Sequence, residues 1–534
     1  MGAKSSRIAR KPAVVEARRI AAEFDVSAEQ VRKTVTHFVR QMEDGLSKDG
    51  DTMIPSYVTV LPTGTEKGVC LAVDIGGTNC RVCSVELHGD RTFSIKQTKS
   101  TIPPHLRIGS TSADLFSFIA QEVETFLRKH YSKNYKAHKA QGRDSLVIDN
   151  ESAQKDHLPL GFTFSFTFQQ IAIDKGIMAR WDKGFDIPDA IGQDVCGLLQ
   201  EQIDKLNVPV RVTALANDTV GTLMARSYTS LDNGSPILGA VFGTGTNGAY
   251  VEKRKNVTRL GPSNEQAENM IINTEWGSFD ETLTVLSTTP YDRRLDEADI
   301  HPGEQMLEKR VSGMYLGELF RFALLSILEK SEHGFLGNCS KRDLKNSPLF
   351  KPYGVDTSIM SSIEADKSTL LSATRRCLEK ELGVARVSIE DAAIAKIIAE
   401  AIGRRAARLS GAAIAAVIVK TGRLNDSFGE AKYLDVGVEG SLVEHYPRFE
   451  ENIRGALRDV SEIGLSGEKR IRIGLAKDGS GVGAALIAMV ADKQKPRKAE
   501  TVVDGARKKG VDVQETRLSA ADTGPAPMQP VAVA

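Results

Sequence analysis

The segment 71–82, which reads LAVDIGGTNCRV, constrains the fold more than any other part of the chain. An apolar run ends at Asp74, the pair Gly76 and Gly77 follows, and the apolar alternation resumes at Val82. This pattern predicts a β-hairpin whose turn is built from glycines. Glycines let a backbone approach a ligand closely, and the N–H groups of such a turn can cradle phosphate oxygens. The segment therefore predicts a phosphate-binding turn, with Asp74 placed to hold a Mg²⁺-bound water.

The length, charge and cysteine content of the chain limit the kinds of protein that it can be. The chain has 534 residues, enough for two or more domains, and a formal net charge of +1. This charge gives no reason to expect nucleic acid as a partner. No apolar run is long enough to span a bilayer, and the N-terminus lacks the apolar core of a signal peptide. Six cysteines scattered over the chain suit free thiols in a reducing compartment, so we expect a cytoplasmic protein.

The two ends of the chain differ in composition from its middle. Residues 1–13 are basic and polar, which predicts a disordered N-terminal segment. Their first six residues, MGAKSS, also fit the N-myristoylation pattern, and the neighbouring basic residues would serve as the second signal for weak membrane association. Residues 493–534 are charged and then rich in small residues and proline, which predicts a disordered tail.

Strand and helix patterns alternate between these ends and predict an α/β fold. Helices are predicted over 13–46, with a break at 25–27, and over 113–130, 301–328, 389–420 and 449–459. Strands are predicted over 158–166, 208–216, 237–242 and 471–475, with a strand and turn over 433–441. The polar stretch 131–157 has no clear period and is interpreted as a surface insertion.

A second strand-and-turn element repeats the first. The strand 237–242 runs into the turn residues Gly243, Thr244 and Gly245, followed shortly by Asn247. Two turns of this kind imply two similar half-folds that close on one nucleotide.

A carboxylate and an amide lie where another strand meets a helix. The strand 208–216 runs directly into Asn217 and Asp218, and a helical pattern begins there. The carboxyl ends of strands are where α/β sheets bind ligands, which favours a chemical role for Asp218. The alternative is that Asp218 only caps the helix, since Asp is a common N-cap residue.

Other polar side chains lie in apolar or aromatic surroundings. Glu275 lies in a largely apolar run, and because an unpartnered buried carboxylate is costly, we expect it to bind something polar. Gln305 and Glu308 lie three apart, on one face of the first turn of the predicted helix 301–328. Ser165 ends an aromatic strand, and Lys183 follows in the sequence WDKGF. Simple core packing of the tryptophan and a solvated lysine are the alternatives for that sequence.

Five motifs in this order resemble those of the eukaryotic, fungal-type hexokinases: LAVDIGGTNCRV, ANDTVGTLM, FGTGTNG, VEGS and GSGVGAA. The resemblance spans roughly residues 53–489. It implies an α/β fold of the actin-like ATPase type, with two ribonuclease-H-like lobes around a deep cleft. The large lobe would comprise residues 14–71 and 216–480, and the small lobe residues 72–215 and 481–492. The implied activity is ATP-dependent phosphorylation of a hexose at its 6-hydroxyl, with Mg²⁺, by a monomer or homodimer.

The resemblance also assigns roles to single residues. Asp218 would be the base at the 6-hydroxyl, Lys183 would stabilise charge, and Asp74 would act on Mg²⁺ through water. The sugar would be held by Ser165, Lys183, Asn217, Asp218, Asn247, Glu275, Gln305 and Glu308. The phosphates and the nucleotide would be surrounded by Gly76, Gly77, Thr78, Asn79, Arg81, Gly243, Thr244, Gly245, Gly440 and Ser441.

The chain departs from the family pattern at a few positions. These departures are Thr167 for Pro, Asp182 for Thr, Glu439 for Asp, Cys80 for an aromatic residue and Gly403 for Ser. Asp182 places a negative charge beside Lys183, in a loop expected to close on the sugar. An N-acetylglucosamine kinase and a catalytically weak sugar sensor therefore remain alternatives to an active hexose kinase.

Overall fold

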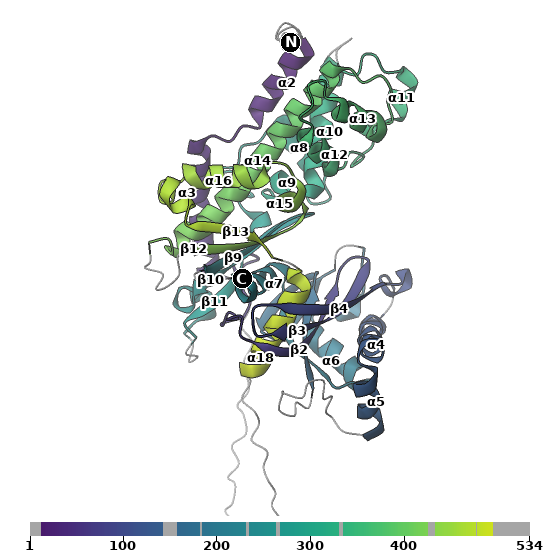
Figure 1. Cartoon of the computed structure of the whole chain (residues 1–534), viewed down its shortest axis with the longest axis vertical. Helices are drawn as coiled ribbons and strands as arrows, with labels where there is room; N and C mark the ends of the chain where they lie inside the picture. Colours follow the sequence, from purple (N-terminus) through teal and green to yellow (C-terminus); the bar gives the residue numbers. More distant parts are fainter. Residues whose placement is uncertain are drawn as a thin grey trace, which may run out of the picture. The chain divides into compact units, whose positions relative to one another are not determined.

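The structure is a computed structural model that describes most of the chain (Figure 1). The described residues are 12–109, 111–141, 157–181, 184–230, 234–262, 267–330, 335–425, 433–476 and 478–494. The predictions for residues 1–11, for Asp182 and Lys183, and for the tail beyond residue 494 lie outside these residues. None of the described helices is long and apolar enough to cross a membrane.

A five-stranded sheet contains the predicted hairpin. Its strand order is β4-β3-β2-β5-β8, from β4 (Phe93–Thr101), β3 (Asn79–His88), β2 (Lys67–Ile75), β5 (Leu158–Phe164) and β8 (Val210–Ala216). Strands β2 and β3 pair antiparallel, whereas β5 runs parallel to both β2 and β8. The hairpin and both predicted strands are confirmed.

Both faces of this sheet are buried, because the side chains of β2 alternate between two apolar cores. Leu71 and Val73 belong to the core formed with α4 (Ser112–His130) and α6 (Val195–Lys205). Cys70 and Ala72 belong to a different core, formed with α18 (Ala484–Gln494). Helix α18 contacts β2, β5 and β8 directly (Figure 1).

A six-stranded sheet contains the second strand-and-turn element. Its order is β1-β11-β10-β9-β12-β13, from β1 (Ile54–Pro55), β11 (Asn269–Asn273), β10 (Thr246–Lys253), β9 (Gly234–Phe242), β12 (Tyr433–Glu439) and β13 (Ile471–Leu475). Strands β9 and β10 form an antiparallel hairpin, and β12 runs parallel to both β9 and β13. The predicted strands 237–242, 433–441 and 471–475 are confirmed.

The largest core surrounds α14 (Ile389–Thr421), which contacts α2 (Pro12–Glu23), α3 (Ala28–Ser47), α12 (Thr357–Ala365) and α16 (Phe449–Asp459). Capping residues define the ends of these helices. Ser388 and Asp391 form a capping box at the start of α14, and Gly422 ends it in the left-handed region with φ 63°. Ser27 caps α3 after the predicted break. These helix predictions are confirmed.

The remaining helices are short or flank these elements. They are α5 (Ser132–Gln141), α7 (Asp218–Thr229), α8 (Pro290–Ala298), α9 (Glu308–Val311), α10 (Gly313–Lys330), α11 (Lys341–Asn346), α13 (Ser372–Glu381), α15 (Ser441–His445) and α17 (Gly464–Glu468). Two further strands, β6 (Thr167–Ala172) and β7 (Lys175–Arg180), form a separate pair. The single-turn helices are η1 (Pro104–Leu106), η2 (Pro188–Ala190), η3 (Arg254–Asn256), η4 (Thr258–Leu260), η5 (Trp276–Ser278) and η6 (Pro348–Phe350).

Two predictions in these regions need correction. The predicted helix 301–328 does not begin at residue 301, because the chain turns at Gln305 (φ 57°) and the helices start at Glu308 and Gly313. The stretch 131–157 is not wholly a surface insertion, because its first part forms α5 with buried Tyr131 and Tyr135. The Tyr131 hydroxyl donates a hydrogen bond of 2.9 Å to the Ser84 hydroxyl.

Three described segments connect the sheets: residues 56–66, which lead from β1 to β2, and two further segments that cross each other at glycines. Helix α7 leads from β8 to β9, and η7 (Gly479–Gly483) leads from β13 towards α18. A Cβ on Gly221 of α7 would lie 2.3 Å from the Gly479 carbonyl, and one on Gly483 would lie 2.1 Å from the Gly221 Cα. Any side chain here would separate the two connections. The predicted lobe boundaries stay predictions, and strand β2 runs across the one placed at residue 71.

Candidate active site

A pocket of about 650 Å³ opens beside the turn between β2 and β3. Its lining is polar and carries both signs of charge: Asp74, Gly76, Gly77, Thr78, Asn79, Arg81, Gln97 and Lys99. The Gly76 N–H donates to the Asn79 carbonyl at 3.1 Å, which closes the turn. Nothing lies within 4 Å of where a Cβ on Gly76 would be, so this side of the turn is open to a ligand. The pocket suits a polar anion that contacts backbone N–H groups.

Arg81 ties this turn to the connection η7. Its guanidinium donates to Asp74 at 3.1 Å, to Asp478 at 2.8 Å and to the Ser480 hydroxyl. Two carboxylates therefore share the charge of Arg81 before any ligand binds. Lys99 pairs with Arg81 across β3 and β4, lines the same pocket and is exposed. Among the described residues no carboxylate pairs with Lys99, so its charge is available to an anion in the pocket.

The second turn, Gly243 to Gly245, is held by the start of α10. The Gly243 N–H donates to the Gly245 carbonyl at 3.0 Å. The first N–H groups of α10, from Gly313 and Met314, donate to the carbonyls of Gly243 and Thr244 at 2.7 and 3.1 Å. The Thr244 residue itself is exposed. The turn is therefore fixed from behind while its other side remains accessible.

Gly440 and Ser441 lie next to this second turn, at the end of β12. Gly440 has φ 116°, and a Cβ there would lie 2.4 Å from the Phe242 carbonyl, so only glycine allows this close approach. Ser441 begins α15 and is exposed. The structure thus brings the end of β12 against the end of β9, as expected for two parts of one nucleotide site.

Asn217, not Asp218, caps helix α7. The Asn217 side chain accepts hydrogen bonds from the Thr219 N–H at 2.9 Å and from the Thr219 hydroxyl. Asp218 is the first helical residue, and its carboxylate accepts from the same N–H at 2.8 Å. The interpretation of Asp218 as the N-cap is therefore wrong. The carboxylate lies at the N-terminal end of the helix, which is the positive end of the helix dipole.

A hydrogen-bonded cluster joins Asn247, Asn273 and Glu275. The Asn247 amide donates to Asn273 at 2.9 Å and to Glu275 at 3.1 Å, and the Asn273 amide donates to Glu275 at 2.6 Å. Burial raises the pKa of Glu275 to about 7, and the negative charges of Asp218 and Glu308 act in the same direction. Asp218 and Glu308 are therefore each close enough to act on Glu275. Asn273, the last residue of β11, was not predicted, because its contact with Asn247 arises only when β10 and β11 pair.

Gln305 and Glu308 reach this cluster from the turn before α9. Glu308 accepts a hydrogen bond of 3.0 Å from the Thr246 N–H, directly behind the second turn. The Gln305 amide donates to the Ser278 hydroxyl at 2.9 Å, and its carbonyl oxygen lies 2.2 Å from where a Cβ on Gly277 would be. Glycine at 277 is thus what makes room for Gln305. Both residues lie near Glu275, although not by the helical spacing that the sequence suggested.

Ser165 follows β5 and is half-buried. Its N–H donates to the Ile75 carbonyl at 3.2 Å, which places it beside the first turn. The aromatic residues around it pack together: the Trp181 ring lies 4.8 Å from that of Phe166 and 5.5 Å from that of Phe185. The packing alternative for Trp181 is confirmed. Lys183 and Asp182, which follow Trp181, lie outside the described residues.

Two departures from the family pattern have structural reasons. A Cβ on Gly403 would lie 2.4 Å from the Tyr446 hydroxyl, so the phenol occupies the space of a side chain at 403. That hydroxyl donates to the Ala399 carbonyl at 3.2 Å. Cys80 is buried in the core of the five-stranded sheet, and burial raises the pKa of its thiol. Neither position contributes a reactive group to the site.

Two phosphate-type turns, each on its own sheet, together with a carboxylate and amide cluster next to the second turn, are the features of a kinase of the actin-like ATPase class that acts on a polyhydroxylated substrate. The comparisons with known proteins agree. Two family models described as hexokinase match residues 16–228 and 237–490. The chain therefore belongs to the hexokinase family. The predicted two-lobed, actin-like ATPase fold is confirmed.

Individual relatives match over nearly their whole length. A glucokinase from Aspergillus niger is 49% identical over 493 residues, covering 90% of this chain and 98% of the relative. Glucokinase-1 from Saccharomyces cerevisiae is 40% identical, covering 89% and 96%. The solved structure of a hexokinase from Schistosoma mansoni complexed with glucose has a TM-score of 0.70 at 33% identity, covering 89% and 98%. The chain is an ATP-dependent sugar kinase that phosphorylates a hexose.

Proposed function

We propose that this chain transfers the terminal phosphoryl group of ATP to the 6-hydroxyl of glucose, with Asp218 as the base. The observation that carries the proposal is the place of Asp218, the first residue of α7 directly after β8, where its charge acts on the buried Glu275. Phosphoryl transfer needs alignment and charge neutralisation, and a positioned carboxylate to accept the hydroxyl proton. The names of the relatives, glucokinases above all, favour glucose as the hexose.

Several carboxylate and amide side chains would form hydrogen bonds with the sugar hydroxyls. We assign this role to side chains from four separate segments, together with Ser165 beside the first turn and Lys183: Asn217, Asn247, Glu275, Gln305 and Glu308. A site built to pair each hydroxyl rejects a sugar that leaves one buried group unpaired. This selectivity is the purpose we assign to the Asn247–Asn273–Glu275 cluster.

Mg²⁺ fits the residues at the first turn. Mg²⁺ keeps several waters and is held by one or two carboxylates together with substrate phosphates, rather than by a cage of protein ligands. The described residues contain no group of three or more His, Cys, Asp or Glu side chains that would form such a cage. Asp74 is partly exposed in the pocket and would act on the ion through water. The bound ion would neutralise charge on the transferring phosphoryl group.

A sugar panel tests the substrate. We expect the highest kcat/KM on glucose among glucose, fructose, mannose and N-acetylglucosamine, measured by coupled ADP release. A preference for N-acetylglucosamine would instead assign the chain to that kinase activity. No turnover on any of the four sugars would favour a sugar sensor. A cytoplasmic location and an acyl chain on Gly2 are further proposals, the latter tested by mass spectrometry of the native N-terminus.

Lys99→Met is expected to raise the KM for ATP by about threefold to tenfold, with the KM for glucose unchanged. Lys99 lines the first pocket, and Arg81, the other cation there, is already shared between two carboxylates. Lys96→Met is the matched control, because Lys96 is on the same strand but lies over the Tyr131 ring, at 4.6 Å. Equal effects of the two variants on the KM for ATP would contradict a phosphate contact by Lys99.

Glu275→Gln is expected to stabilise the sugar-free protein at neutral pH. The folded state raises the pKa of Glu275 from 4.5 to about 7, so the folded protein holds a proton that the unfolded chain releases. The free energy of unfolding of the wild type therefore falls as pH rises from about 4.5 to 7. Urea unfolding at pH 5 and 8 should show the advantage of the variant growing with pH. An advantage independent of pH would mean that Glu275 titrates normally.

A further inference from the structure

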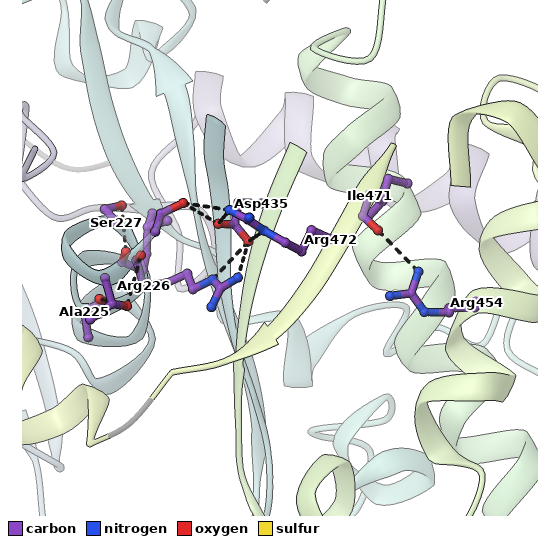
Figure 2. Close-up of polar contacts among 10 residues, drawn as sticks. Ala225, Arg226, Ser227, Asp435, Arg454, Ile471 and Arg472 are labelled. Atoms are coloured by element: carbon purple, nitrogen blue, oxygen red, sulfur yellow. Dashed lines mark hydrogen bonds and ion pairs between the residues drawn. The ribbon is translucent and has the colours of Figure 1, made fainter. Parts of the chain in front are cut away.

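Polar side chains near both ends of strand β12 contact helix α7 from one face of the strand. Asp435, Gly437 and Glu439 alternate along the strand and so share a face. Asp435, which is fully buried, accepts from Arg226 of α7 at 2.7 and 2.9 Å (Figure 2). A Cβ on Gly437 would lie 2.6 Å from the Arg226 Cβ, so glycine lets the arginine stem cross the strand. This end of the face anchors the C-terminal half of α7.

Glu439 makes the contacts at the other end of this face. Its carboxylate accepts from the Gly479 N–H at 2.9 Å and lies 3.3 Å from the Thr222 hydroxyl. Thr222 belongs to α7, and Gly479 is the first residue of η7. A Cβ on Gly479 would lie 2.4 Å from the Thr222 hydroxyl oxygen and 2.6 Å from the carboxylate. One carboxylate thus bridges the two crossing connections, α7 and η7, close to their glycine contact.

Thr222 also contacts Asp218, the proposed base. Its hydroxyl also donates to the Asp218 carbonyl at 2.9 Å, one helical turn away. The charged groups that act on Glu439 are Asp478 of η7 and Asp218 of α7, and Asp478 is in turn paired with Arg81 of β3. Burial, the main cause, and these two negative charges raise the pKa of Glu439. Because Coulomb interactions are mutual, an ionised Glu439 also disfavours the charge on Asp218.

We propose that Glu439 is a positioning residue that holds the two connections together and thereby sets the place and the charge of Asp218. The contact between Glu439 and the Gly479 N–H depends on the length of the Glu439 side chain, because β12 is fixed on both sides by β9 and β13 and cannot shift to compensate. An aspartate at this position would withdraw the carboxylate by about 1.5 Å and release the Gly479 N–H. The proposal rests on Asp218 being the base.

Two substitutions at Glu439 separate the effect of its side-chain length from the effect of its charge. Glu439→Gln keeps the length and an acceptor oxygen, so kcat at its pH optimum should change less than threefold. Removing the negative charge lowers the pKa of Asp218, so the acid limb of the kcat/KM profile should move to lower pH. Glu439→Asp keeps the charge but not the reach, and kcat should fall about tenfold with the KM for glucose unchanged. Melting temperatures of both variants show whether either change acts through unfolding.

Glu462→Gln and Glu462→Asp are the matched controls, because Glu462 is exposed and distant in sequence from both connections. They should leave the pH profile and kcat unchanged. The proposal is overturned if Glu439→Gln leaves the acid limb in place, or if Glu439→Asp folds and turns over like the wild type. Should Glu439→Asp not fold, the pH profile of Glu439→Gln alone decides. A failure of the base assignment is recognised separately, by an Asp218→Ala variant that retains full turnover.

Discussion

Asp218→Ala is expected to lower kcat by about two to four orders of magnitude, the usual effect of removing a positioned acid–base group. The carboxylate lies at the start of α7, where its charge acts on Glu275. Glucose binding should weaken much less, because Asn247, Glu275 and Glu308 keep their contacts. Single-turnover rates and glucose binding on the same variant separate chemistry from binding.

The fold should survive this substitution, because Asn217 is the residue that caps α7. Asn217→Ala serves as the control for the cap and should cost about 1 kcal/mol of stability. If Asp218→Ala instead lowers the melting temperature while turnover stays near that of the wild type, Asp218 is structural. That outcome would remove the base from the proposed mechanism.

Asp435→Ala is expected to destabilise the protein by about 3–5 kcal/mol, because it leaves Arg226 and Arg472 beside each other without their shared carboxylate. Arg472 donates to Asp435 at 2.6 Å (Figure 2). The Ser230 hydroxyl donates to the same carboxylate. Urea unfolding measures the loss. Asp44→Ala is the matched control: Asp44 pairs with Lys48 at 3.0 Å on the surface, and its loss should cost less than about 1 kcal/mol.

The pH dependence of the free energy of unfolding is a second test of the prediction for Asp435→Ala. The two arginines and Ser230 hold the pKa of Asp435 below its usual value of 3.8 against the effect of burial. The stability that this pairing contributes is therefore complete above about pH 4 and is lost as pH falls through the lower, folded pKa. The difference between wild type and Asp435→Ala should shrink only in strong acid. A difference that already shrinks between pH 7 and 5 would contradict the lowered pKa.

The parts of the fold that were predictable carry local signals. The hairpin of β2 and β3 follows from alternation around a Gly-Gly turn, and α14 follows from a long, Ala-rich helical pattern closed by Gly422. The helix predicted from residue 301 was wrong at its start. A left-handed residue at Gln305, stabilised by contacts to Glu281 and Ser278 elsewhere in the chain, overrides the local pattern.

The site residues likewise divide into those that a local sequence signal predicts and those that it does not. The glycine turns, Asn217 and Asp218 lie at strand ends, where chemistry is expected, and were predictable from one segment each. Asn273, Lys99 and Asp478 were not, because their roles arise from pairing between distant segments. Lys99 reaches the first pocket only through its register with Arg81, and Asp478 meets Arg81 from 397 residues away in the chain. No property of these segments alone indicates either contact.

The central claim is that this chain places a phosphoryl group on the 6-hydroxyl of a hexose. The most direct test incubates the purified protein with ATP, Mg²⁺ and carbon-labelled glucose, and identifies the product by NMR. The account predicts one product, phosphorylated at the 6-position, formed together with an equal amount of ADP. Phosphorylation at another hydroxyl, or ADP formed without any sugar phosphate, would contradict it.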